Sequence, residues 1–152
     1  MLTINYDPAT ANHASPKATL GAIYWHEGKA YKYVQFIDDV TYALGHVCLW
    51  ANDSGTAVTN DKDGTSIADT DPTAGICLRA MTADYYGYIQ VSGTAEVLGD
   101  TNVAAAEYVK SHTVDGAAIV MGDTYEELAF GIALEADDLT TVLFTCALKG
   151  LL

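Results

Sequence analysis

The chain has 152 residues, 20 of them acidic and 7 basic, and its formal net charge is −13. A surface this acidic repels phosphate backbones, which excludes nucleic acid as a partner. Half of the residues are hydrophobic, yet no apolar run approaches the ~20 residues that span a bilayer. The start, Met1-Leu2-Thr3-Ile4-Asn5-Tyr6-Asp7, lacks the basic and apolar parts of a signal peptide. We therefore expect no membrane partner and synthesis in the cytoplasm.

The first 19 residues differ in composition from the remainder. They contain Pro8, Pro16 and many small or polar residues, and their large apolar side chains are Leu2, Ile4 and Tyr6 near the start. Proline interrupts strand ladders, so this stretch cannot build a core of its own. We predict an extended N-terminal arm over residues 1–19, whose three apolar anchors bind a surface outside a single β domain over residues 20–152.

A glycine motif repeats along the β domain. Gly75-Ile76-Cys77-Leu78 recurs as Gly131-Ile132-Ala133-Leu134 and more loosely as Gly21-Ala22-Ile23-Tyr24, and each copy leads into a second strand-like segment. A period of about 55 residues that carries strands but no helical pattern indicates repeated hairpin units. With 13 glycines and 10 tyrosines, the chain is predicted to be all-β, a compact β-sandwich or β-barrel of two and a half repeats. The half repeat is expected to complete a sheet opened by the first.

The predicted strands follow from turn signals in chain order. Glu27-Gly28-Lys29 separates strands over residues 21–26 and 30–36, and further strands are expected over 47–51 and 56–59. In the second repeat, a hairpin covers 75–81 and 85–92, and Gly93 is expected to break it before 94–98. Residues 103–111 favour helix locally at their alanines, but the repeat predicts a strand there. Strands over 117–121, 131–136 and 140–148 close the chain.

Four tyrosines follow the strand period of two: Tyr31 and Tyr33, then Tyr86 and Tyr88. Successive side chains of a strand point to opposite faces. Tyr31 and Tyr33 therefore point away from the apolar face that Val34 and Phe36 form, and Tyr86 and Tyr88 point away from the apolar face of their own strand. The tyrosines either form a second buried face or an exposed stripe that binds protein or sugar, since tyrosine combines a large area with a polar tip. They are the candidate interface residues.

No catalytic or metal site is predicted. Cys48, Cys77 and Cys146 lie in apolar segments and are expected to be buried free thiols, and His46, two residues before Cys48, lacks an orienting partner. The calcium-like stretch that begins at Asp61 places Pro72 where the binding loop requires glutamate. Nucleophile, phosphate-loop and zinc motifs do not occur. We expect no cofactor and no enzymatic activity.

Three segments resemble the small capsid decoration, or cement, proteins of tailed bacteriophages. They are Tyr31-Lys32-Tyr33-Val34-Gln35-Phe36, Gly87-Tyr88-Ile89-Gln90-Val91-Ser92-Gly93-Thr94-Ala95 and Gly131-Ile132-Ala133-Leu134. The resemblance covers about residues 20–148 and departs from the family at Ala105-Ala106-Glu107, where the family has a Gly-Asp type of turn. It implies a β-rich homotrimer on the outer capsid surface of the virion that holds neighbouring major capsid proteins together, with no catalytic residues.

Two other functions remain open at this point. A carbohydrate-binding or fibre-type adhesive module of a virion would use the tyrosines to stack on sugar rings, and glycan binding without capsid would favour it. A hydrolase would require a buried carboxylate pair in a cleft.

Overall fold

The computed structural model describes residues 7–37, 41–61, 73–99, 103–111, 116–120, 129–134 and 139–144. Within these ranges every regular element is a β-strand, and none of the residues forms a helix able to cross a membrane. The ten strands are β1 (Ile23–His26), β2 (Lys29–Phe36), β3 (Val47–Trp50), β4 (Ala57–Thr59), β5 (Thr73–Cys77), β6 (Tyr86–Leu98), β7 (Tyr108–Ser111), β8 (Ala118–Val120), β9 (Gly131–Ala133) and β10 (Leu139–Phe144). The all-β prediction is confirmed.

Five strands close into a barrel. Their order is β2-β4-β3-β5-β6, and β6 pairs back onto β2. The β2–β4 contact is parallel and the other four are antiparallel. β1 extends this barrel as an edge strand on β2, through the two-residue turn Glu27-Gly28. Both turn residues have positive φ (49° and 76°), as the tight hairpin predicted from this sequence requires.

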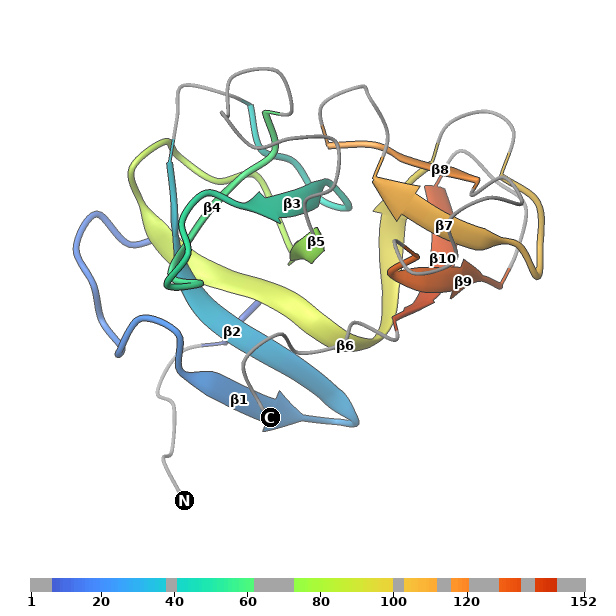
Figure 1. Ribbon diagram of the computed structural model, residues 1–152. Coiled ribbons are helices and arrows are strands. Elements are labelled where there is room, and N and C mark those ends of the chain that lie inside the picture. The colour runs from blue at the N-terminus through green and yellow to red at the C-terminus, as the bar shows by residue number, and fades with distance from the viewer. Residues whose placement is uncertain are drawn as a thin grey trace.

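The remaining strands form a second sheet on the far half of β6. Its order is β6-β10-β9-β7-β8, and a parallel bridge between Gly99 and Ala118 leads back to the end of β6. The order of strand pairing is the same as in the first barrel. β6 takes the place of β2, and β7, β8, β9 and β10 take the places of β3, β4, β5 and β6. Figure 1 shows β6 curving from one group of strands into the other.

The two copies also share individual hydrogen bonds. Gly45 N donates to Cys77 O at 2.9 Å, and Ala106 N donates to Ala133 O at 2.8 Å. Cys77 N donates to His46 O and Ala133 N donates to Glu107 O, both at 2.9 Å. The repeat inferred from the glycine motif is therefore a structural repeat, in which β5 corresponds to β9.

Two sequence expectations about strand connections were wrong. The closing half repeat does not complete a sheet opened by the first repeat, because β10 pairs with β6 and β9 while β6 itself closes the first barrel. Gly93 does not break the hairpin either: β6 is continuous over 13 residues. With φ of 93°, Gly93 bends the strand, and buried Gln90 donates from Nε2 to Ser92 O and Thr94 O across the bend. A single strand can thereby serve both halves.

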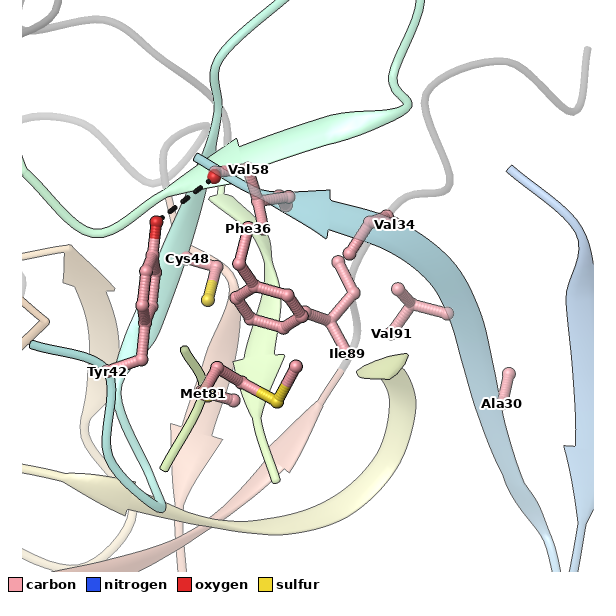
Figure 2. Packing of buried hydrophobic residues seen from close by; sticks show 11 residues of the cluster. Ala30, Val34, Phe36, Tyr42, Cys48, Val58, Met81, Ile89 and Val91 are labelled. Atoms are coloured by element: carbon pink, nitrogen blue, oxygen red, sulfur yellow. Dashed lines mark hydrogen bonds between the residues drawn. The ribbon is translucent and has the colours of Figure 1, made fainter. Parts of the chain in front are cut away.

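The first barrel is filled by side chains from all five of its strands (Figure 2). Phe36 meets Tyr42 edge to face, with ring centroids 5.0 Å apart, and the Tyr42 hydroxyl donates to Ile37 O and Val58 O. The aromatic ring thus stays in the core while its polar tip is satisfied. Full burial of one such side chain contributes about 1.5–3 kcal/mol.

β3 and β5 are buried on both faces. Alternate residues point to opposite sides of a strand, so Cys48 and Cys77 face the first barrel while Val47 and Ile76 join the core of the second sheet. The first barrel and the second sheet therefore share a wall.

Candidate binding surfaces

The predicted tyrosine stripe lies beneath the N-terminal part of the chain. Tyr33 and Tyr88 are 1% and 2% exposed, and their rings lie 4.9 Å apart at 60°. Residues 7–20, here called the N-terminal strap, cover them with Ala11, Ala18 and Leu20. Tyr31 and Tyr86 are half-buried at the margin. Of the two alternatives for the tyrosines, a second buried face or an exposed stripe, Tyr33 and Tyr88 therefore follow the first. Their rings offer no open surface on which a sugar could stack.

Polar contacts fix the strap to the barrel. His13 exchanges two backbone hydrogen bonds with Tyr86, each 2.8 Å. The Tyr33 hydroxyl accepts from Lys17 N at 3.0 Å and lies 3.0 Å from His13 Nδ1. Arg79 Nη1 donates to Thr10 O at 2.7 Å. Residues 7–19 of the predicted arm are thus ordered by the β domain itself, whereas the sequence analysis had expected a surface outside that domain to order them.

The two tyrosine hydroxyls lie in different surroundings. Burial, and then the neighbouring Tyr33, raises the pKa of Tyr88 to about 12. Its hydroxyl is buried with no hydrogen-bond partner among the described residues. Burial, followed by the charge of Lys17, lowers the pKa of His13. His13 in the strap and Tyr88 beneath it therefore both favour their neutral forms.

Leu2, Ile4 and Tyr6, the predicted capsid-binding anchors, lie outside the described residues. So do Cys146 and most of the calcium-like stretch, residues 62–72. Their roles remain predictions.

The two described cysteines form a buried pair in the first barrel, and both are free thiols. A hydrogen bond with Cys77 and burial raise the pKa of Cys48 well above its ordinary value. His46 Nδ1 lies 2.8 Å from Asn60 Nδ2, so this ring is engaged away from the thiol. No group of three or more His, Cys, Asp or Glu in the described ranges could hold a metal ion.

Exposed aromatic groups gather at edge strand β1. Trp25 is 61% exposed, and on the opposite face Tyr24 and His26 stack with centroids 6.0 Å apart at 13°. His26 Nε2 lies 3.7 Å from Oε1 of Glu27, the first residue of the turn. The pair is solvent-exposed and contributes little.

A second exposed apolar surface lies on the outer side of β7 and β9. Tyr108 and Leu134 are each 50% exposed, and half-buried Ile132 lies between them, directly opposite Tyr108 in the pairing of the two strands. We call these three residues the β7–β9 face. Sequence reasoning missed it, although Tyr108 and Leu134 occupy repeat positions whose counterparts are apolar.

Comparison with known proteins gives a fold and no family. No family model matches the chain, and no curated protein matches it. Among solved structures, it is similar to the N-terminal base of the head fibre protein gp8.5 of bacteriophage phi29. The TM-score is 0.52 at 10% sequence identity, over 76% of this chain and 94% of that one. At 10% sequence identity, this similarity is a similarity of fold alone.

Proposed function

We propose that this chain is a structural protein of a phage virion. In this proposal it binds the outer surface of the capsid shell as a homotrimer and bridges neighbouring major capsid proteins. The observation that carries the proposal is the shared fold with the base of a phage head fibre, which matches 94% of that chain. The decoration-protein resemblance of the sequence points to the same class of protein by an independent route.

The arrangement of polar groups supports a role without catalysis. Both described thiols are buried. The hydrogen bond between them raises the pKa of Cys48 and lowers the pKa of Cys77, and the described residues offer no metal-binding cluster. Reactive cysteines, by contrast, combine a lowered pKa with exposure to solvent, and Cys77 lacks the exposure. A non-enzymatic, cofactor-free function is part of the proposal.

In this proposal Leu2, Ile4 and Tyr6, which precede the strap, remain the anchors that bind the capsid. Because the strap packs on the barrel, a deletion that tests these anchors must stop before Asp7. Removing residues 2–6 should leave the melting temperature of the domain unchanged and weaken its retention on shells. Three apolar anchors at about 1.5–3 kcal/mol each, less the entropy of ordering the segment, correspond to orders of magnitude in affinity.

The direct experiment mixes the purified chain with shells prepared without it and images them by electron microscopy. We expect added density on the outer surface at threefold and quasi-threefold positions. The deletion of residues 2–6 and a Leu2→Ser, Ile4→Ser, Tyr6→Ser variant should both need a higher protein concentration than the intact chain to occupy half of the sites. Bare shells at saturating protein would refute the proposal.

A glycan-binding module is the second candidate, and the exposed Trp25 favours it. An indole with 61% exposure on an edge strand is a surface on which a sugar ring can stack. Screening the chain against immobilised glycans, with Trp25→Ala as the variant and Leu134→Ala as the control, separates this function from the first. Glycan binding that Trp25→Ala abolishes would replace the capsid proposal.

A further inference from the structure

The β7–β9 face has an exact counterpart in the first barrel. Tyr108 lies opposite Ile132 in the β7–β9 pairing, just as Val47 lies opposite Ile76 in the β3–β5 pairing. The backbone bonds Cys77 N to His46 O and Ala133 N to Glu107 O fix the same register in both copies. Leu134 follows β9 as Leu78 follows β5.

The counterpart face is covered. Val47 and Ile76 are 2% and 1% exposed because they form part of the core of the second sheet, and Leu78 packs against the buried Tyr33–Tyr88 cluster. At Val47 and Ile76 the outer side of these two strands is thus the interface with the following repeat unit, while Leu78 is covered within the tyrosine cluster of the first barrel. In the second copy no further repeat follows among the described residues, and Tyr108 and Leu134 are half exposed.

We propose that the β7–β9 face is the surface through which copies of this chain associate, each copy presenting the same face to its neighbour about a rotation axis. The internal repeat identifies the occupant, because the covered equivalent of this face packs against another unit of this same chain. In the proposed trimer this face of each copy turns toward the threefold axis, where it contacts both neighbours and the assembly closes.

Charge sets the salt dependence of this association. Lys110 lies two residues after Tyr108 on β7 and therefore on the same side of the strand, in a chain with 7 basic and 20 acidic residues. The net charge of −13 per chain opposes association at long range, and added salt should therefore tighten the assembly as it screens this repulsion.

The inference rests on the self-association contained in the proposed function and specifies where it occurs. Sedimentation of the full chain at micromolar concentration tests it without capsids. Tyr108→Glu and Leu134→Glu should each weaken association at least tenfold, because a carboxylate replaces an apolar contact. Trp25→Glu is the matched control, an exposed aromatic on the first barrel, and should sediment like the parent chain.

A monomeric parent chain would overturn both the interface and the trimer. Variants that associate like the parent would overturn this interface and leave the trimer standing. Binding of the variants to shells, imaged separately, reports on the capsid function alone.

Cross-linking keeps the test decisive if a glutamate variant fails to fold. In a Cys146→Ser background, Leu134→Cys should be joined between copies by a short bismaleimide, and Trp25→Cys should not. Failure of Leu134→Cys to link copies, with the parent associated, would refute the interface.

Discussion

The strongest test of the structural repeat exchanges residues at one pair of equivalent turns. Gly45 and Ala106 occupy the same place in the two copies and have φ of 82° and 68°. This conformation destabilises the folded state by about 1–2 kcal/mol for a residue other than glycine. Glycine avoids this cost, but its greater freedom in the unfolded chain lowers the free energy of unfolding by about 0.4–1 kcal/mol. We expect Ala106→Gly to raise the free energy of unfolding by about 0.5–1 kcal/mol.

Gly45→Ala should act in the opposite direction and more strongly. A Cβ at Gly45 would lie 3.1 Å from Leu98 N and 3.4 Å from Glu96 O, so close packing adds to the left-handed strain. The cost is about 1–2 kcal/mol by the same conformational argument. For a chain of this size, 1 kcal/mol changes the melting temperature by about 2–4 °C.

Differential scanning calorimetry or urea unfolding measures both variants. The reasoning requires opposite signs, since one substitution introduces the strain that the other removes. If Ala106→Gly destabilises the chain as much as Gly45→Ala does, the two turns are not equivalent and the structural repeat is wrong.

Three further predictions concern the strap. Tyr33→Phe leaves Lys17 N without its acceptor and should lower the free energy of unfolding by about 1–2 kcal/mol. Tyr88→Phe removes a buried hydroxyl with no partner in the described chain and should be neutral or stabilising. The urea midpoints of the two variants measure this difference. The pKa of Tyr88 is about 10 in the unfolded chain and is raised to about 12 in the folded chain. The neutral hydroxyl of Tyr88 therefore contributes its full stabilisation of the fold below pH 10, and this contribution is lost between pH 10 and 12. Tyr88→Phe should reduce the fall of the urea midpoint over this pH range. The lowered pKa of His13 means that protonation favours the unfolded state as pH falls below about 6.5. The protection factors of the strap amides, which are corrected for the intrinsic exchange rate at each pH, should fall from pH 7 to pH 5, and His13→Gln should remove this fall.

Local signals in the sequence predicted much of the fold. Glu27-Gly28 specified its hairpin through backbone geometry, and alternation along residues 30–36 correctly separated Val34 and Phe36 from the tyrosines. The Gly-Ile-x-Leu motif located β5 and β9. In each case, the information lies within a few neighbouring residues.

Long-range partners could not be predicted in the same way. Period-two alternation assigns Tyr33 and Tyr88 to one face of the sheet, but it does not say what covers that face. The strap meets them through single contacts such as His13 with Tyr86, which leave no periodic signal. The pairing of β10 with β6 likewise depends on closure in space, and Gly93 can end a strand or bend one.

The sharing of β6 by both halves has a mechanical consequence. Where two domains are joined by a linker, one can detach while the other stays intact. Here the joint is itself a strand of 13 residues, held by hydrogen bonds to β2 and β5 on one half and to β10 on the other. A pull that separates the halves along this strand loads many hydrogen bonds at once, so the molecule resists stretching as one body and has no weak hinge along β6.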